Sequence, residues 1–405
     1  MHGQRLLLVG VGVTGRPYIT AARRLGVRVH AVETAPRAEA LAGLADEVTV
    51  CRGGSDELWY EAACEAVRHT RPDGVVAFSE PHVLAAALVQ NELGLPGPSL
   101  RASVLSRNKA LQRGRFAAAG IGQPEFLVTE RLGEGRDWAA GRFPVVVKPL
   151  SSAGSAGVEL VGDRGAFEDA VARRDTEGRL LVERAATGPE YSWEALVRHG
   201  KVWFANLTAK ETTGPPYFVE VAHRVATGAD AATRATVADL GGAVLDALGM
   251  DTGIVHLEFR LTARGPAVME VAVRTPGDHL MDLLGDAYGI DWYEMVVRLA
   301  LGADLPAPPA APLRHTAGYL PSARPGTVTE IRGLDEVRAH PHVVAAEVTA
   351  APGDTVAPAR SSVERVGHVL LSAPDPGTLE VALDDVRTTL RVVTRPGGLP
   401  DDGTS

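Results

Sequence analysis

The sequence predicts an α/β protein with more than one domain. Its 405 residues exceed the roughly 100 to 200 residues of a usual domain, so two or three hydrophobic cores are expected. Apolar residues make up 45% and charged residues 22% of the chain, which is typical of globular proteins and argues against long disordered segments. Between residues 5 and 100, short apolar runs alternate with helical stretches. That alternation is typical of βαβ units around a parallel sheet.

The first predicted domain spans residues 1–105. Its expected strands and first helix are Arg5 to Val9, Arg16 to Leu25, Val27 to Val32 and Val75 to Phe78. A long helix rich in alanine and leucine is expected after the last of these strands. Together these elements predict a parallel sheet with helices between its strands.

A glycine-rich turn follows the first predicted strand. Gly10, Gly12 and Gly15 have the spacing of a dinucleotide-binding turn, and Glu33 ends the next strand near the expected ribose position. The same glycines serve any tight strand-to-helix turn, and no hydride-transfer residues accompany them. An NAD-dependent oxidoreductase is therefore kept only as a minor alternative.

The second predicted domain spans residues 106–304. Asn108 to Ala119 predicts a helix that ends at Gly120. From about residue 143 to residue 300, longer strands are joined by glycine-rich turns, and a helix over Trp292 to Leu301 closes the region.

The end of the chain is predicted to hold a small α+β domain at residues 313–396. A linker rich in proline and alanine, Leu305 to Pro312, precedes it, and it contains short strands and a helix near Leu379 to Leu390. Residues 397–405 are expected to form a flexible tail.

Composition excludes several partners. The net charge is -9 and the pI is near 5.8, so a broad binding face for nucleic acid is not expected. No apolar run approaches the roughly 18 residues that a membrane span needs. Cys51 and Cys64 lack the spacing of a zinc site or a disulfide framework and are expected to be reduced. We expect a cytoplasmic protein without nucleic-acid or membrane partners.

Two carboxylates are predicted to face each other in a hairpin. Apolar residues alternate with His256, Glu258 and Arg260 in one strand, and residues 267–274 alternate in the next. A five-residue loop over 262–266 would pair Leu261 with Ala267 and place Glu258 opposite Glu270, on a face shared with Val268, Ala272 and Arg274. Opposed carboxylates are unfavourable unless a positive charge lies between them, so the pattern predicts a divalent cation there. An ordinary solvated strand face is the alternative.

A phosphate-binding loop is predicted after residues 144–149. Lys148 ends this apolar strand, and the loop that follows contains Ser151, Ser152, Gly154, Ser155 and Gly157. Small residues let backbone amides approach phosphate oxygens, and the lysine supplies a point charge. The loop is not a Walker loop, because GxxxxGK[ST] is absent from the sequence.

Lysine is rare in this chain. Only four of the 41 basic residues are lysines, and they are Lys109, Lys148, Lys201 and Lys210. The pattern suggests that lysine is kept where a compact ammonium matters. Codon bias is the alternative.

The order and spacing of these residues resemble the ATP-grasp superfamily along the whole chain. The resemblance implies a Rossmann-like N-terminal domain, a two-lobed ATP-binding region and a small C-terminal α+β domain. It implies that Lys109 and Lys148, with their Ser/Gly loop, contact the phosphates of ATP. It also implies that Glu183, Arg184 and Ala185 meet adenine, that Glu190 holds the ribose, and that Arg274 steadies the transferring phosphoryl group. Glu258 and Glu270 would bind Mg²⁺, with Mn²⁺ as a second candidate.

One position departs from the superfamily pattern. Many members carry Glu-x-Asn-x-Arg, with the asparagine as a further metal ligand, whereas this chain has Ala272 at that place. Alanine cannot coordinate a metal, so the number of metal ions stays open.

A narrower resemblance is to the L-amino acid ligases, an ATP-grasp group that forms dipeptides. It is carried by Glu-x-x-x-Arg-x-Pro-Gly-x-His, which ends at Gly277 and His279, and by the segment from Pro216 to His223. By this resemblance Glu220 and His223 help to hold the substrate, and Lys210 reaches a phosphate or carboxylate. A surface strand is the alternative for Glu220 and His223. Asp278 would select a polar or cationic group, or be a solvated loop acid.

The resemblance implies a carboxylate–amine ligase that forms an acyl phosphate and then an amide, releasing ADP and phosphate. Its expected partners are small carboxylate and amine substrates, with amino acids the foremost candidates, and a homodimer is the expectation for the superfamily. Other ATP-grasp ligases remain open alternatives, using bicarbonate, formate or a ribosyl-amine, or loading an amino acid onto a carrier protein. A noncatalytic nucleotide-binding regulator is a further alternative.

Overall fold

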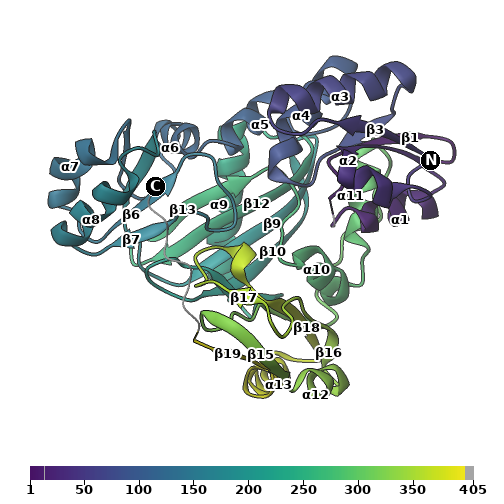
Figure 1. Ribbon diagram of the computed structural model, residues 1–405. Coiled ribbons are helices and arrows are strands. Elements are labelled where there is room, and N and C mark those ends of the chain that lie inside the picture. The colour runs from purple at the N-terminus through teal and green to yellow at the C-terminus, as the bar shows by residue number, and fades with distance from the viewer. Residues whose placement is uncertain (13, 397–405) are drawn as a thin grey trace.

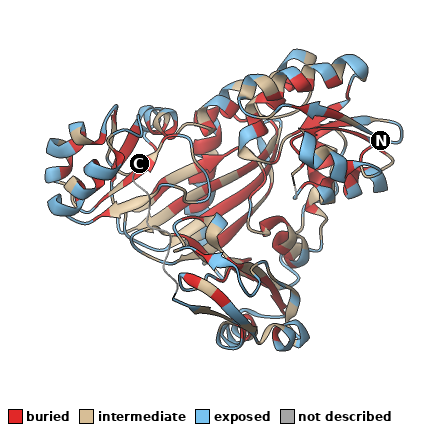
Figure 2. Ribbon diagram, in the orientation of Figure 1, coloured by how far each residue is buried: buried red, intermediate tan, exposed pale blue. Residues whose placement is uncertain are grey.

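The computed structural model describes residues 1–12 and 14–396, so the predicted tail at 397–405 lies outside the described residues. Three smaller lobes surround a central sheet in Figure 1: the N-terminal lobe, a small lobe containing residues 126–184, and the C-terminal lobe. Buried residues concentrate in the strands, while the outward sides of the peripheral helices are exposed (Figure 2).

The N-terminal lobe is a parallel sheet with helices on both faces. Its main elements are β1 (Arg5–Val9), α1 (Arg16–Arg24), β2 (Arg28–Thr34), α2 (Ala35–Ala38), β3 (Glu47–Cys51), α3 (Asp56–His69), β4 (Gly74–Val76), α4 (Val83–Leu93) and α5 (Leu100–Ser106). The strand order is β3-β2-β1-β4. Leu6 and Leu8 pack toward α1, while Leu7 and Val9 pack toward α3 and α4, so alternate residues fill two cores. Both faces are buried, as is usual for parallel sheets.

The glycine-rich turn of this lobe is closed by the protein's own carboxylate. Glu33 is 1% exposed, and its Oε2 accepts hydrogen bonds from the backbone amides of Val11 at 2.9 Å and Gly12 at 2.6 Å. A Cβ at Gly10 would lie 2.0 Å from the ring of His82. The amides that would receive a pyrophosphate thus bind a negative side chain instead. This geometry argues against the NAD alternative.

The small lobe is an antiparallel sheet of order β5-β8-β6-β7 with two helices. Its elements are β5 (Phe126–Thr129), α7 (Arg136–Ala140), β6 (Val145–Pro149), β7 (Glu159–Val161), α8 (Arg164–Arg174) and β8 (Leu180–Arg184). Phe167 of α8 is 1% exposed and packs in a core with Val145, Val147 and Val182. This core supports the strand that ends at Lys148.

The central sheet has eight strands in the order β13-β12-β9-β10-β11-β14-β18-β16. Its strands are β9 (Glu190–Arg198), β10 (Lys201–Thr212), β11 (Glu220–Val225), β12 (Gly253–Thr262), β13 (Gly265–Ala272), β14 (His315–Tyr319), β16 (Val343–Val348) and β18 (Gly367–Ala373). The helices associated with it are α6 (Lys109–Ala118), α9 (Ala231–Leu248), α10 (Leu280–Tyr288) and α11 (Trp292–Ala300). One face packs on α5, α6 and α9 through residues such as Trp193, Leu257 and Phe259. The opposite face packs on α10 and α11 at one end, through residues such as Leu196, Phe204 and Ile254, and carries polar side chains at the other end.

Two sequence predictions about the β12–β13 hairpin are wrong. Thr262 pairs with Gly265, so the turn is shorter than the predicted five-residue loop, and Leu261 pairs with Pro266 rather than with Ala267. A bulge between Glu258 and Phe259 then shifts the register by one residue and restores the pairing of Glu258 with Glu270. The bulge also reverses the alternation, so Val268 lies in the apolar core and not on the face of Glu270.

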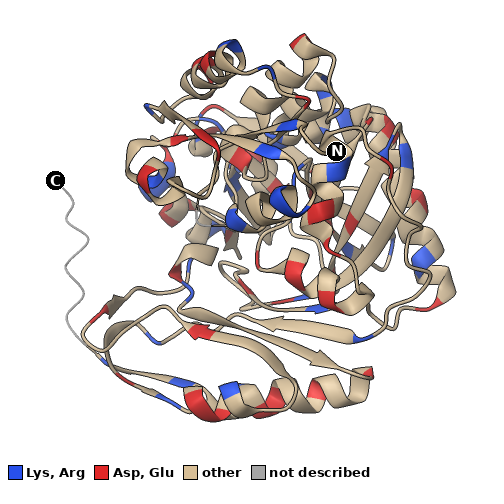
Figure 3. Ribbon diagram, turned by 90° about the vertical axis from the view of Figure 1, so that its right-hand side faces the viewer, with Lys and Arg blue, Asp and Glu red and all other residues tan. Residues whose placement is uncertain are grey.

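The C-terminal lobe shares strands with the central sheet. Its further elements are β15 (Gly326–Arg332), α12 (Leu334–Ala339), β17 (Thr355–Val356), α13 (Pro376–Thr389) and β19 (Arg391–Arg395), and β17, β15 and β19 form a separate sheet. In the turned view of Figure 3, acidic and basic residues are interspersed, with several acidic residues on the helices of this lobe.

Two elements cross the predicted domain limits. α11, from the predicted second domain, packs on α1 of the N-terminal lobe, and Gly74 lies against the carbonyl of Ala300. β14 pairs with β11 and so joins the C-terminal lobe to the central sheet. The limits at 1–105, 106–304 and 313–396 therefore stay a prediction. Among the described residues, no helix is both long and apolar enough to cross a bilayer.

Candidate active site

Two adjoining cavities lie where the lobes meet. The first, of about 250 Å³, lies between the small lobe and the polar face of the central sheet. The second, of about 650 Å³, lies between the N-terminal and C-terminal lobes. Glu270, Arg274 and Asp278 line both cavities, so the two spaces meet at the end of β13.

Most of the predicted site residues line these cavities. The first cavity is lined by Lys109, Lys148, Ser152, Gly154, Ser155, Glu183, Arg184, Ala185, Glu190, Lys210, Glu220, His223, Glu258, Glu270, Arg274, Gly277 and Asp278. The second adds Ser151 and His279. Gly157 is in the lining of neither, and a Cβ there would lie 2.8 Å from Pro149, so it serves the loop's backbone path at φ +73°.

A buried ion triad holds Lys148 at the base of the first cavity. Lys148 Nζ lies 2.6 Å from Glu183 Oε2, and the guanidinium of Arg113 pairs with the other oxygen of Glu183. Burial lowers the pKa of Lys148, while Glu183 opposes that effect. Burial would raise the pKa of Glu183, but Arg113 and Lys148 outweigh it and hold that pKa below its usual value.

The side chain of Glu183 is therefore committed to Lys148 and Arg113. Arg184 and Ala185, the other two residues predicted to contact adenine, also line the cavity. Sequence reasoning missed Arg113, which is 0% exposed and lies 70 positions from Glu183. One arginine in an arginine-rich helix carries no local signal of such a pairing.

Lys109 is placed by a helix cap. Asn108 Oδ1 accepts hydrogen bonds from the amides of Ala110 at 3.0 Å and Leu111 at 3.2 Å, which fixes the start of α6. Lys109 is 4% exposed, and its Nζ donates to Ser152 O at 2.6 Å and lies 3.1 Å from Glu270 Oε1. One ammonium thus contacts both the Ser/Gly loop and a predicted metal ligand.

The Ser/Gly loop is held between two lobes. Ser155 Oγ donates to Phe218 O at 3.3 Å, and Gly154 O accepts a hydrogen bond from the amide of Ser362 at 2.9 Å. A Cβ at Gly154 would lie 3.2 Å from Ser362 Cβ, so the C-terminal lobe packs closely on the loop.

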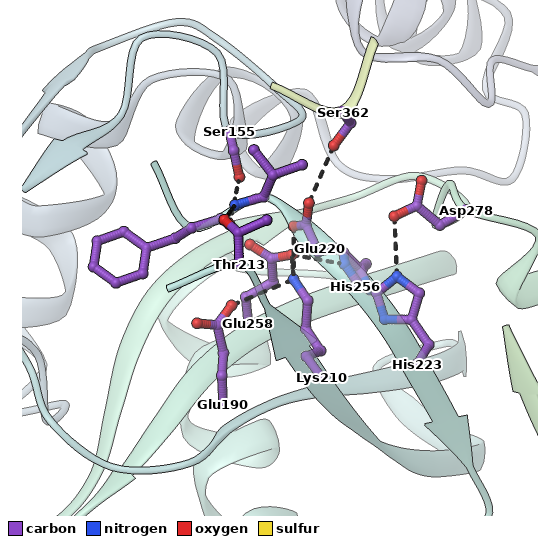
Figure 4. Close-up of polar contacts among 12 residues, drawn as sticks. Ser155, Glu190, Lys210, Thr213, Glu220, His223, His256, Glu258, Asp278 and Ser362 are labelled. Atoms are coloured by element: carbon purple, nitrogen blue, oxygen red, sulfur yellow. Dashed lines mark hydrogen bonds and ion pairs between the residues drawn. The ribbon is translucent and has the colours of Figure 1, made fainter. Parts of the chain in front are cut away.

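Lys210 is the centre of a cluster of carboxylates on three strands. Its Nζ lies 2.5 Å from Glu258 Oε1, 3.2 Å from Glu220 Oε1 and 3.5 Å from Glu190 Oε1, and Figure 4 shows these side chains converging on it. Burial alone would lower its pKa, but the three carboxylates raise it well above the usual value. Lys210 is therefore a permanent positive charge at the site, and Glu190 is held further by Arg260 at 2.7 Å.

Glu220 and His223 are 8% and 1% exposed, so the surface-strand alternative is wrong for them. Ser362 Oγ donates to Glu220 Oε2 at 3.1 Å, and His223 Nε2 lies 3.0 Å from Asp278 Oδ2 (Figure 4). Asp278 is also paired with Arg365 at 2.9 Å. Burial would raise the pKa of Asp278, but His223 and Arg365 hold it well below its usual range. Asp278 is therefore a bound ion-pair partner, not a solvated loop acid.

His256 links Glu258 to a second buried acid. Its ring nitrogens lie 3.1 Å from Glu194 Oε1 and 3.2 Å from Glu258 Oε1. Burial would lower the pKa of His256, but the two carboxylates raise it to about 9. Glu194 also accepts hydrogen bonds from Thr208 at 2.7 Å and Asn206 at 3.1 Å. The alternation of polar residues along β12 places His256 on this face, whereas Glu194 sits in a mainly apolar run and gives no signal.

Arg274 lies at the junction of the cavities. Its Nε donates to Glu80 Oε2 at 2.8 Å, and its Nη1 donates to the carbonyl of the next residue, Thr275, at 2.8 Å. Glu80 comes from the N-terminal lobe, 194 positions earlier, and was not predicted. His279 follows at the start of α10 and stacks on His368 at 4.0 Å.

The two carboxylates of this site suit a divalent cation whose coordination is completed by a bound ligand and water. Glu258 and Glu270 are register partners and line the first cavity together. The part of the chain that the structure describes holds no cluster of three or more His, Cys, Asp or Glu side chains suited to a metal. Two carboxylates with phosphate oxygens and water are a set that Mg²⁺ accepts. In this structure the ammonium groups of Lys109 and Lys210 neutralise one oxygen on each carboxylate.

Two protein-family models match the part of the chain that forms this site and the C-terminal lobe. Residues 141–282 match the ATP-grasp domain. This stretch contains the Ser/Gly loop, Lys210, and the two predicted metal ligands Glu258 and Glu270. The chain therefore contains an ATP-grasp domain. Residues 318–395 match the L-amino acid ligase C-terminal domain 2.

Solved and curated relatives agree with this assignment. The structure of an L-amino acid ligase from Bacillus licheniformis superposes with a TM-score of 0.84 at 23% identity, over 98% of this chain and 100% of that chain, which confirms the predicted ATP-grasp fold class. Carnosine synthase 1 from Gallus gallus is 28% identical over 82% of this chain and 40% of its own length. A formate-dependent phosphoribosylglycinamide formyltransferase from Anaeromyxobacter dehalogenans is 28% identical over 90% of this chain and 97% of its own length. The chain thus spans less than half the length of the carnosine synthases that it matches.

Proposed function

We propose that the protein is an ATP-dependent carboxylate–amine ligase that joins two small substrates, both amino acids, through an acyl phosphate. The observation that carries the proposal is the meeting of two cavities at Arg274. A phosphate-binding arrangement of Lys109, Lys148 and the Ser/Gly loop lines one side, and a second polar cavity opens on the other. A reaction that moves a phosphoryl group from a nucleotide to a substrate needs this adjacency.

In the first proposed step, an oxygen of the substrate carboxylate attacks the γ-phosphorus of ATP. The bond between that phosphorus and the β,γ-bridging oxygen breaks, so ADP leaves with the electron pair and an acyl phosphate forms. Lys109 and Lys148 offset charge on the phosphates, and Arg274 faces the transferring group from the junction. Preorganised positive charge of this kind lowers the barrier without reorganisation.

Glu258 and Glu270 would hold Mg²⁺, or Mn²⁺ in its place. A bound ion would supply neutralisation of the negative charge on the phosphates. With Ala272 in place of a third ligand, the two carboxylates are the protein's contribution to the ion.

In the second proposed step, the amine nitrogen attacks the carbonyl carbon of the acyl phosphate. The bond from that carbon to the phosphate oxygen breaks, inorganic phosphate leaves, and the nitrogen loses a proton as the amide forms. The acyl phosphate must be kept from water during this interval. The contact of Ser362 with both Gly154 and Glu220 supports this role, because it closes the C-terminal lobe over the loop.

The substrate class rests on the relatives. The related structure from Bacillus licheniformis is that of an L-amino acid ligase, and residues 318–395 match a domain of the L-amino acid ligases. A formate-using ligase is the second candidate, since the relative from Anaeromyxobacter dehalogenans covers 90% of the chain.

The experiment incubates the purified protein with ATP, Mg²⁺ and pooled amino acids, measures ADP release and identifies products by mass spectrometry. We expect ADP release that depends on amino acids, and a dipeptide product. Arg274→Ala should lower kcat on the order of 10²-fold, because it removes a charge that faces the developing negative charge. Amino-acid-independent ADP release, or stimulation by formate with a ribosyl-amine alone, would contradict the proposal.

A further inference from the structure

The second cavity contains one carboxylate that lacks a strong positive partner. Four acidic side chains line this cavity. Three of them are ion-paired: Glu80 with Arg274, Glu270 with Lys109, and Asp278 with Arg365. The fourth, Asp282, has no lysine or arginine within ion-pair distance among residues 1–12 and 14–396.

Asp282 is held in place by contacts with Tyr293 and His279, neither of which is a lysine or arginine. Tyr293 donates its hydroxyl hydrogen to Asp282 Oδ1 at 2.8 Å, and His279 Nδ1 lies 3.1 Å from Asp282 Oδ2. Each carboxylate oxygen can accept more than one hydrogen bond, so both retain capacity for a ligand. Burial and the adjacent charge of Asp282 raise the pKa of Tyr293, so the phenol stays a neutral donor. The side chain of Asp282 is 39% exposed and therefore accessible from the cavity.

An aromatic wall runs from the reacting end of the cavity to Asp282. Tyr18 stacks on Phe78 with ring centroids 4.5 Å apart and meets Tyr293 edge-on at 4.9 Å. Tyr18 donates its hydroxyl hydrogen to Thr275 Oγ1 at 2.8 Å, next to Arg274, while Tyr293 contacts Asp282. An alkyl chain can lie along such a wall with a positive head at its acidic end.

We propose that the second cavity binds an amino acid with a cationic side chain of the lysine or ornithine type, whose ammonium pairs with Asp282. This assignment rests on the proposed ligase function. It also revises the sequence expectation for Asp278: the selection of a cationic group passes to Asp282, because Asp278 already carries Arg365 and His223. Glu80 is likewise excluded by its pairing with Arg274.

The test compares lysine with norleucine, which has a side chain of similar length without the charge. Each is supplied with alanine as the second substrate, and kcat/KM is measured by ADP release with identification of the product. The variant is Asp282→Asn, which keeps hydrogen-bonding capacity toward Tyr293 and His279. Asp286→Asn is the matched control, because Asp286 is exposed on the same helix.

We expect the wild-type protein and Asp286→Asn to prefer lysine over norleucine. Asp282→Asn should lower kcat/KM for lysine about tenfold, through KM, while changing the value for norleucine less than twofold. Asp282→Lys should move the preference toward glutamate. Amino-acid-dependent turnover without a preference for lysine, or an equal loss for lysine and norleucine, overturns the inference but not the ligase function. Failure of every amino acid to stimulate ADP release overturns both.

Discussion

Replacement of Lys210 by methionine should destabilise the protein strongly, because it leaves three carboxylates around an uncharged side chain. The Lys210 ammonium lies within 3.5 Å of Glu190, Glu220 and Glu258, and its side chain is 2% exposed. At an effective dielectric constant of about 20, each contact is worth on the order of 5 kcal/mol before desolvation is subtracted. After subtraction, removing one partner of a buried ion pair costs about 3 to 5 kcal/mol.

The assay is thermal unfolding followed by circular dichroism, with Lys201→Met as the control. Lys201 begins β10 beside an exposed turn, and its side chain is exposed. We expect a much lower midpoint for Lys210→Met than for Lys201→Met, and partial recovery on adding Mg²⁺, since a divalent cation can neutralise Glu258. Equal midpoints for the two variants would refute the argument that Lys210 compensates the carboxylates.

Two further predictions concern other lysines and a buried histidine. Lys148→Arg should raise KM for ATP at least tenfold, because a planar guanidinium does not fit the closed triad with Glu183 and Arg113. Lys201→Arg should leave KM unchanged. Steady-state kinetics measure both values, and equal effects would favour codon bias as the explanation of the lysine pattern. Burial lowers the pKa of His82 to about 4, so as the pH falls the unfolded chain protonates this histidine at a higher pH than the folded chain does. The free energy of unfolding should therefore decrease by up to about 3 kcal/mol as the pH drops from about 6.5 toward 4. His82→Gln should flatten this part of the profile of melting midpoint against pH, and an unchanged slope would count against it.

Local patterns predicted much of the fold and of the site. The alternation of apolar and polar residues along β12 put His256 and Glu258 on one face, and the predicted pairing of Glu258 with Glu270 is present. That pairing, however, arises from two features that cancel, a shorter turn and a bulge of one residue. Period-two alternation does not reveal a bulge, so the face of Val268 was predicted wrongly.

Three of the missed residues act across lobes. Arg113 pairs with Glu183, Glu80 with Arg274, and Arg365 with Asp278, at separations of 70, 194 and 87 positions. The sequence around each partner gives no sign of the ion pair, because its local pattern of apolar and polar residues is explained without one. Such pairs follow from how the lobes pack, which spacing within a strand or helix does not specify.

This packing gives a physical reason for the positions of the few lysines. Lys109 and Lys148 are 4% and 6% exposed, and the side chain of Lys210 is 2% exposed, whereas Lys201 is on the surface. Two of the buried ammonium groups contact oxygens that approach from different directions: Lys109 meets Ser152 O and Glu270, and Lys210 meets three carboxylates, whereas Lys148 pairs with Glu183. An ammonium donates three hydrogen bonds in a tetrahedral arrangement, whereas a guanidinium donates in one plane. An arginine-rich chain that must hold oxygens from several directions therefore has a reason to keep lysine at positions 109 and 210, and codon bias does not predict that the exposed lysine is the one outside the site.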